Sequence, residues 1–313
     1  MGQGLGVIMS NLAASYSIAK SLDRKPILYL DALKDTLFSD QQMKEDKPGY
    51  SEQEQTLLHT FPNISKHFEI EEKIPQFASP HAPKTLSFNT FLGLDDLLKN
   101  LKASDALIGR SAAGQPTLPS EQSTLTVDVS ANRFLFERDL DFFREELFVF
   151  SDEILEKTKP YVIDRQDQSI ALSLRLEYYL HQKKHNRLTD HTALSPEYYS
   201  KALENFSNVA FPYGVVVFVF CDFPNESSDF IDEIFFANGV MALMGNKFNA
   251  SELLCIFSQC KHAVLSNSAF AFWGAALNKN QRAKIICPKN YMKDCPWLNG
   301  RWYLPEWEAL EQV

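Results

Sequence analysis

The spacing of apolar residues becomes regular in the second half of the chain. From residue 169 onward, short continuous apolar runs alternate with segments of helical spacing. The runs predict strands at Ser169–Leu174, Val215–Phe220, Val240–Leu243, His262–Leu265 and Lys284–Cys287. The segments between and after them predict helices at Pro196–Asn205, Asp229–Phe236, Ala250–Cys260, Ser268–Leu277 and Glu306–Glu311. This alternation indicates an α/β fold with a doubly wound parallel sheet that is covered on both faces.

The first half is less regular. It opens on a Gly-rich stretch, which we expect to be a loop. Helical spacing follows at residues 10–22, 90–101 and 136–157, a short strand pattern lies at 26–30, and polar stretches at 41–55 and 109–123 indicate loops. We expect an N-terminal α/β domain over residues 1–158 and a C-terminal α/β domain over residues 159–313.

Composition narrows the class of protein. Apolar residues make up 45% of the 313 residues and charged residues 23%, which is typical of a soluble globular protein. The net charge of -9, without a basic block, argues against a nucleic-acid partner. No apolar run is long enough to span a membrane. We therefore expect a cytoplasmic protein.

The cysteines and histidines also fit a protein of a reducing compartment that has no metal site. The five cysteines contain no Cys-x-x-Cys pair, which favours reduced, mostly buried thiols: Cys221, Cys255, Cys260, Cys287 and Cys295. The seven histidines show no metal-ligand spacing with them, so we expect no metal site.

Polar residues follow three of the predicted strands. Arg175 follows the first strand, Asp222 the second, and Asn267 and Ser268 the fourth. Ligands of open parallel sheets bind at this edge. The helix after Ser268 would offer free backbone amides to an anion, Arg175 could grip a phosphate, and Asp222 suits ribose or base hydrogens. Together they predict a nucleotide site.

Each of these residues also has a simple structural explanation. Asn267 or Ser268 could only cap a helix, Arg175 could be a surface ion-pair partner, and Asp222 could be a turn residue. Their shared edge of the sheet favours the functional interpretation. Nearby Phe272 and Trp273 have the helical spacing of core residues.

Four stretches resemble the α-1,2-fucosyltransferases. The most specific is SELLCIFSQCKHAVLSNSAFAFWGAALNKNQRAKIICPKNY, in which these residues fit the family pattern: Glu252, Ser258, Cys260, Lys261, His262, Asn267, Ser268, Phe270, Trp273, Ala275, Leu277 and Pro288. LSPEYYSKAL is similar to the family's Tyr-Tyr helix, and FVFCDF to the strand end that carries Asp222. GLGVIMSNLAASYSIAKSL resembles the opening glycine motif, with Gly4 and Gly6.

The resemblance implies two Rossmann-like domains that face a cleft, in a GT-B-like arrangement. It implies inverting transfer of fucose from GDP-fucose to a galactose-type hydroxyl of a glycan or glycolipid, without a metal ion or other cofactor. The donor residues that it implies are Gly4, Gly6, Ser173, Arg175, Asp222, Asn267, Ser268 and Phe270. Arg175 would stabilise the departing GDP, and Glu177 is the second catalytic candidate.

The chain departs from the family at two motifs. Where the family has His-x-Arg-Arg-x-Asp, this chain reads SLRLEY, so Ser173 replaces the His, Leu176 the second Arg and Tyr178 the Asp. In the opening motif, Val7 and Ile8 replace Asn and Gln, and the strand expected before the glycines is missing.

These departures leave alternatives open. One is a catalytically impaired relative that serves as a nucleotide- or protein-binding scaffold, and another is a glycosyltransferase with a different donor. The catalytic base is also open among Glu177, Asp190 and His191. Peripheral membrane contact, a Golgi lumenal location if an N-terminal anchor precedes the chain, and the oligomeric state stay open as well.

Overall fold

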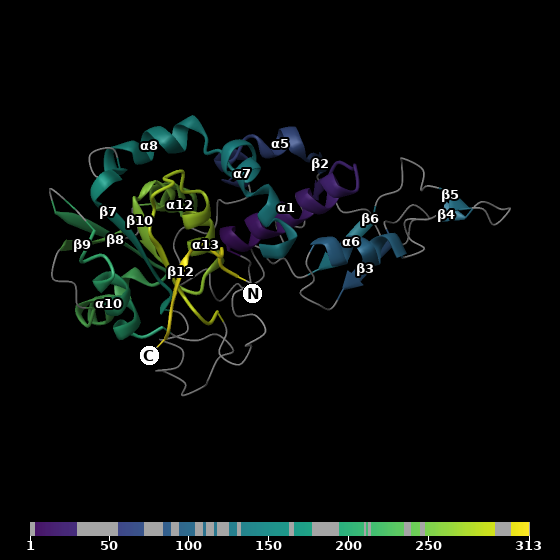
Figure 1. The fold of residues 1–313 in the computed structure, drawn as a ribbon. Coiled ribbons are helices and arrows are strands. Elements are labelled where there is room, and N and C mark those ends of the chain that lie inside the picture. The colour runs from purple at the N-terminus through teal and green to yellow at the C-terminus, as the bar shows by residue number, and fades with distance from the viewer. Residues whose placement is uncertain are drawn as a thin grey trace.

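The computed structural model describes fifteen parts of the chain. They are residues 4–29, 56–71, 84–88, 94–103, 109–110, 116–117, 125–129, 133–162, 166–176, 194–209, 211, 214–234, 239–244, 248–291 and 302–312. The second half holds the largest sheet (Figure 1). Its strands are β7 (Ser169–Leu174), β8 (Val215–Cys221), β9 (Gly239–Leu243), β10 (His262–Val264), β11 (Ile285–Pro288) and β12 (Glu308–Leu310). Its helices are η4 (Gln166–Gln168), α10 (Pro196–Glu204), η5 (Pro224–Glu226), α11 (Ser228–Asp232), α12 (Ala250–Gln259) and α13 (Ala269–Ala276).

The six strands form one parallel sheet in the order β12-β11-β10-β7-β8-β9. Counted along the chain, this is the Rossmann order, with its reversal between β7 and β10. The predicted α/β class and the doubly wound sheet are therefore confirmed. The reversal matters for function, because a crevice for a ligand opens where neighbouring strands send their connections to opposite faces.

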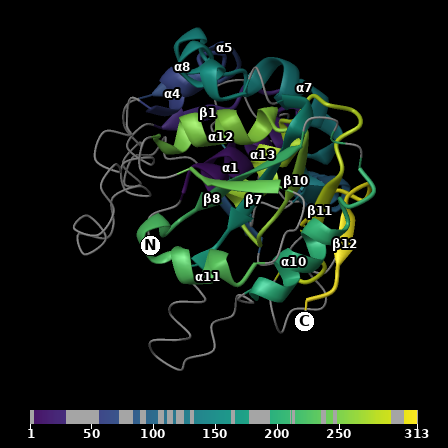
Figure 2. The ribbon, with the colours of Figure 1, turned by 90° about the vertical axis from the view of Figure 1, so that its left-hand side faces the viewer.

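Helices cover both faces of this sheet. Figure 2 shows α12 above the sheet and α10 and α11 below it. Every residue of β7 is buried, which explains why this strand reads as a continuous apolar run. Alternate residues of β7 serve the two faces: Ile170 and Leu172 pack in the cluster that contains the α10 side chains, and Ala171 packs in the cluster that contains α12 and α13.

The predicted boundaries in the second half agree with the structure to within one residue, with two exceptions. Helix α11 ends at Asp232, earlier than expected, because the chain tightens into a turn in which Ile234 N donates to Ile231 O at 3.0 Å. The terminal helix predicted at Glu306–Glu311 is wrong, because the structure places strand β12 there. A six-residue helix is marginal alone, whereas β12 gains backbone hydrogen bonds by pairing in parallel with β11.

The first half contributes smaller elements. Its helices are α1 (Leu5–Ser21), α4 (Thr56–Thr60), α5 (Ile64–His67), α6 (Leu94–Ala103), η1 (Arg133–Leu135), η2 (Glu137–Asp139), α7 (Leu140–Phe142), the π-helix η3 (Phe143–Leu147) and α8 (Asp152–Val162). Its strands are β1 (Ile27–Tyr29), β2 (Glu69–Glu71), β3 (Lys84–Phe88), β4 (Gly109–Arg110), β5 (Pro116–Thr117) and β6 (Leu125–Val129). Pairs β1–β2 and β3–β6 are parallel, and β4–β5 is antiparallel.

Three expectations for this half need correction. The Gly-rich stretch is not a loop: α1 begins at Leu5, with Gly4 as its N-cap. The stretch 109–123, expected to be a loop, contains the paired strands β4 and β5. The helix predicted over 136–157 is broken into four pieces. Its π turn, closed by Phe148 N donating to Phe143 O at 2.8 Å, brings these two rings, five residues apart, against Trp273.

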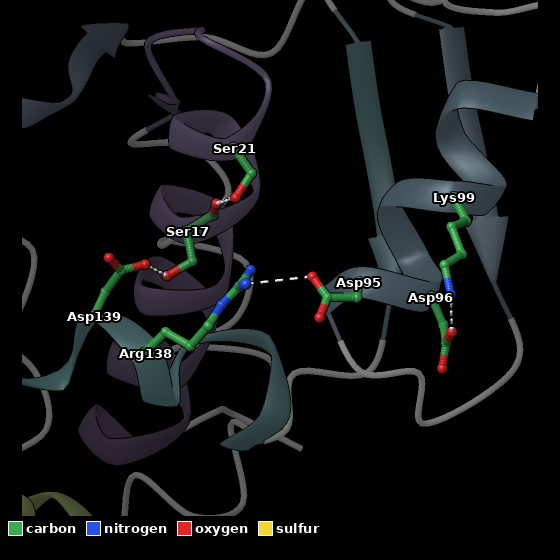
Figure 3. Close-up of polar contacts among 7 residues, drawn as sticks. All are labelled: Ser17, Ser21, Asp95, Asp96, Lys99, Arg138 and Asp139. Atoms are coloured by element: carbon green, nitrogen blue, oxygen red, sulfur yellow. Dashed lines mark hydrogen bonds and ion pairs between the residues drawn. The ribbon is translucent and has the colours of Figure 1, made fainter.

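Polar contacts connect the small elements to α1 (Figure 3). Asp139 on η2 accepts a hydrogen bond from Ser17 Oγ at 2.6 Å. The neighbouring Arg138 reaches in the other direction and pairs with Asp95 on α6 at 3.3 Å. Segment η2 thus lies between α1 and α6.

The two predicted domains share one core. Helix α1 of the first half packs against α13 of the second half. Helix α8 crosses the predicted boundary and packs against α12.

Candidate functional site

The ends of β7 and β8 bring a cation and a carboxylate together. Leu174 and Cys221 pair in register, so the next residue of each strand leaves the sheet at the same level. Arg175 Nε lies 3.3 Å from Asp222 Oδ2, and the Leu176 N–H donates to Asp222 Oδ1 at 2.8 Å. The Arg175 side chain is 32% exposed and that of Asp222 18%. The carboxylate therefore orients a guanidinium that an anion in solution can still reach.

The turn after β10 lies on the other side of the reversal. Ser266, Asn267 and Ser268 are all buried. The Ser266 hydroxyl is hydrogen-bonded to that of Ser173 at 2.8 Å, which joins the two strands that flank the reversal. Asn267 Nδ2 donates to Tyr291 O at 3.2 Å. Ser173 and Asn267 thus brace the edge of the sheet. The sequence analysis did not identify their partners, Ser266 for Ser173 and Tyr291 for Asn267. Only the three-dimensional structure shows these pairs.

Ser268 holds the N-cap position of α13, but its side chain makes no capping hydrogen bond. Its backbone is extended, and Ser268 N donates to Ser266 O at 2.8 Å. The simple interpretation of Ser268 as a side-chain cap is therefore wrong. The first amides of a helix have no partner within that helix. At α13 they begin directly beside the end of β10, as a phosphate site at this edge requires.

The beginning of α1 meets the beginning of α13. A Cβ atom on Gly6 would lie 2.4 Å from Ala269 C and from Phe270 N, so only glycine allows this approach. Around Gly4, by contrast, nothing lies within 4 Å of such an atom. The predicted residues Gly6 and Phe270 are thus in close contact, and Gly4 lies two positions before Gly6 as the N-cap of α1. For Gly6, packing explains the residue without any ligand.

Two buried tyrosines on α10 fix the strand ends. Tyr198 Oη donates to Leu265 O at 2.9 Å, and Tyr199 is hydrogen-bonded to the backbone of Arg175. Burial raises the pKa of both hydroxyls, so both stay protonated. The Tyr-Tyr pair of the sequence LSPEYYSKAL therefore holds the ends of β10 and β7 from one helix.

The positions that depart from the family pattern are mostly core positions. Leu176 is 1% exposed and packs in the same apolar cluster as the α10 tyrosines. Ile8 is also buried, whereas Val7 is partly exposed. Glu177, Tyr178, Asp190 and His191 lie outside the described residues. A catalytic role for Glu177 stays a prediction.

The remaining titratable groups have structural roles. Burial lowers the pKa of His262 to about 4, and its Nδ1 accepts a hydrogen bond from Lys284 N at 2.9 Å. The four cysteines that the structure describes are free thiols, as predicted, and burial raises the pKa of Cys260 and Cys287 to about 12. Within the described ranges, no group of three or more potential ligands could hold a metal ion.

The same part of the chain contains no helix that is both long and apolar enough to cross a bilayer. This finding concerns the helices alone.

The sheet edge thus brings an oriented cation and a helix N-terminus to the reversal, which is where sheets of the Rossmann order bind ligands. Residues 131–311 match glycosyl transferase family 11, and the chain belongs to this family. The resemblance to the fucosyltransferases is thereby confirmed at the level of the family.

The solved structures to which this chain is similar include two fucosyltransferases. Fucosyltransferase NodZ from Bradyrhizobium is 13% identical, with a TM-score of 0.49 over 88% of this chain and 89% of that chain. POFUT1 in complex with GDP is 13% identical, with a TM-score of 0.48 over 91% of this chain and 96% of that chain. In sequence, the chain matches no curated protein. Family membership rests on the match over residues 131–311.

Proposed function

We propose that this protein transfers fucose from GDP-fucose to a galactose-type hydroxyl of a glycan or glycolipid, with inversion and without a metal ion. The observation that carries the proposal is the Arg175–Asp222 pair beside the first turn of α13, at the reversal of the sheet. Membership of glycosyl transferase family 11 supports a sugar as the transferred group.

The reaction breaks the bond between the fucose anomeric carbon and the diphosphate oxygen. The acceptor oxygen bonds to the opposite face of that carbon, and its proton passes to a base, for which Glu177, Asp190 and His191 are the candidates. Negative charge grows on the leaving GDP. Arg175 and the amides of α13 are suited to stabilise it, because donors held in place before the reaction need no rearrangement in the transition state.

Asp222 serves first as a positioning residue for Arg175. One of its oxygens accepts the Leu176 N–H and the other faces Arg175 Nε. A carboxylate oxygen has a further lone pair, so Asp222 can still accept a hydrogen bond from a ribose hydroxyl or from the guanine edge. Gly4 and Gly6 at the beginning of α1, and Asn267 and Ser268 in the turn before α13, would shape the space around the diphosphate.

A second candidate is a scaffold that binds the nucleotide without turnover. Leu176 and Ile8 favour it, because both stand at family positions that are polar and both are committed to the core here. Arg175, Asp222 and the turn at Asn267–Ser268 suit both nucleotide-binding candidates and argue only against a scaffold that binds protein alone, which does not require them together.

Calorimetric titration of GDP and then GDP-fucose into the purified chain, in the presence of EDTA, tests the proposal. We expect micromolar affinity for GDP, followed by release of GDP when lactose is added with GDP-fucose. Binding without turnover on any galactose-type acceptor would favour the scaffold. Absence of binding to either nucleotide would contradict both.

A further inference from the structure

A small hollow lies directly beside the candidate site. Its volume is about 10 Å³, which is room for roughly one water-sized group. Its walls include Ser10 from α1, Arg133 from η1, Ala269 from α13, and Tyr291 and Tyr303. The hollow therefore lies where the first half of the chain meets the nucleotide edge of the sheet.

Three of the walls are joined to that edge. Ala269 is the first residue of α13 and follows Ser268. The Tyr291 carbonyl accepts the hydrogen bond from Asn267, and Tyr303 Oη donates to Ser266 O at 3.2 Å. A group that enters the hollow thus lies next to the residues to which we assign the diphosphate.

Arg133 is the cation in these walls. Its side chain is only 5% exposed, and its Nη1 lies 3.0 Å from Glu137 Oε2. The guanidinium carbon also lies 4.5 Å from the centre of the Phe134 ring. Burial lowers the pKa of Arg133, while Glu137 and Glu306 act in the opposite direction. A buried guanidinium is costly unless anionic groups compensate it, and the Glu137 side chain that pairs with Arg133 is itself 32% exposed.

We propose that Arg133 binds a terminal phosphoryl oxygen of the nucleotide at this hollow. The inference rests on the proposed function. A phosphoryl oxygen is a water-sized anionic group, and arginine is the side chain best suited to phosphate. Arg133 then supplies a cation from the first half of the chain, in addition to Arg175 at the end of β7. Nucleotide binding would join η1 to the edge of the sheet.

The competing explanation is structural. In that case Arg133 only pairs with Glu137, four residues along, and stabilises the η1–η2 segment. The two explanations differ in what Glu137 does. If the ion pair is the whole role of Arg133, loss of either partner has the same effect. If Arg133 binds phosphate, loss of Glu137 leaves the cation in place and GDP binding intact.

The experiment compares GDP and guanosine by calorimetry in the full chain, the R133Q variant and the matched control E137Q. We expect R133Q to weaken GDP binding about tenfold or more, with guanosine binding unchanged, because only the diphosphate contact is lost. E137Q should bind GDP as tightly as the parent chain or more tightly. Circular dichroism and thermal unfolding establish that each variant is folded.

The outcomes separate this inference from the proposed function. If the parent chain binds no GDP, the nucleotide site itself fails. If the parent chain binds GDP and folded R133Q binds it equally well, the role of Arg133 is overturned. If R133Q does not fold, R133K replaces it: weakened GDP binding is expected because an ammonium lacks the guanidinium fork, and parental affinity would contradict the proposal.

Discussion

Tyr198 on α10 donates its hydroxyl hydrogen to the carbonyl oxygen of Leu265, 2.9 Å away at the end of β10. Both residues are fully buried. The next residue along the helix, Tyr199, is hydrogen-bonded to the backbone of Arg175 through its hydroxyl oxygen, which accepts the bond. One helix therefore fixes the ends of the two strands between which the sheet reverses, and so sets the distance across the candidate site.

Replacing Tyr198 by Phe should lower the free energy of unfolding by about 1–3 kcal/mol, because the Leu265 carbonyl would stay buried without its donor. Urea unfolding monitored by circular dichroism measures the loss. Tyr161→Phe is the matched control, since Tyr161 is 44% exposed and its loss of a hydroxyl should change stability by no more than about 0.5 kcal/mol. Equal stability of the Tyr198 variant and the parent chain would contradict the structural role of this bond.

Gly6 gives a second test, of the contact between α1 and α13. Gly6→Ala should destabilise the protein by about 1–3 kcal/mol, because its Cβ would overlap backbone atoms that cannot move aside like a flexible side chain. Gly4→Ser is the control, because the space around Gly4 is open and serine is favoured at a helix N-cap. Thermal unfolding of the two variants should differ clearly. A stable Gly6→Ala variant would show that the helices are not in close contact.

The second half of the fold could be predicted because its strands are buried on both faces. Strand β7 reads as one apolar run for that reason, and its predicted and observed limits are the same. The predicted element limits are wrong where pairing between distant strands decides the structure. Residues 308–310 have no strong strand pattern, and they form β12 only because β11 offers an open edge. Similarly, the π turn at Phe143–Leu147 follows from packing on Trp273 and has no local signal.

The candidate site was predictable in part. Arg175, Asp222 and the turn after β10 could be predicted because each follows the end of an apolar run in the sequence. The structure places all of them on one edge of the sheet. Arg133 lies more than 40 positions before Arg175 in an irregular segment, and nothing in its neighbours marks it as buried. Its place in the hollow depends on how η1 packs against α1, far away in the chain, and the local pattern of residues does not reveal that contact.

His262 makes stability depend on pH. Burial lowers its folded-state pKa to about 4, below the value of about 6.5 expected in the unfolded chain. Below pH 6.5 the unfolded chain therefore binds a proton that the folded chain does not, and stability falls as the pH drops from 6.5 towards 4. The loss attributable to this residue is on the order of 3 kcal/mol across that window.

Urea unfolding of the parent chain and of His262→Asn at several pH values between 7 and 4.5 measures this effect. The parent chain should lose more stability than His262→Asn, whose amide oxygen can still accept the hydrogen bond from Lys284 N. His59→Gln is the control for replacing a histidine elsewhere in the chain, because the His59 side chain is 49% exposed. Identical pH dependence in the parent chain and His262→Asn would exclude His262 as the cause.

Arg175 and Asp222 should affect nucleotide binding to different extents. Arg175→Ala removes the cation and should weaken GDP binding about tenfold or more and abolish donor turnover, with the fold intact because the side chain is partly exposed. Asp222→Asn keeps an oxygen for the Leu176 N–H but loses the charge that orients Arg175, so it should bind GDP with intermediate affinity. Calorimetry gives the affinities, and Arg138→Ala, which removes an exposed arginine on η2, should bind GDP like the parent chain. Full turnover in Arg175→Ala would exclude it as the phosphate ligand, whereas parental GDP affinity in Asp222→Asn would mean that the guanidinium needs no carboxylate to hold it.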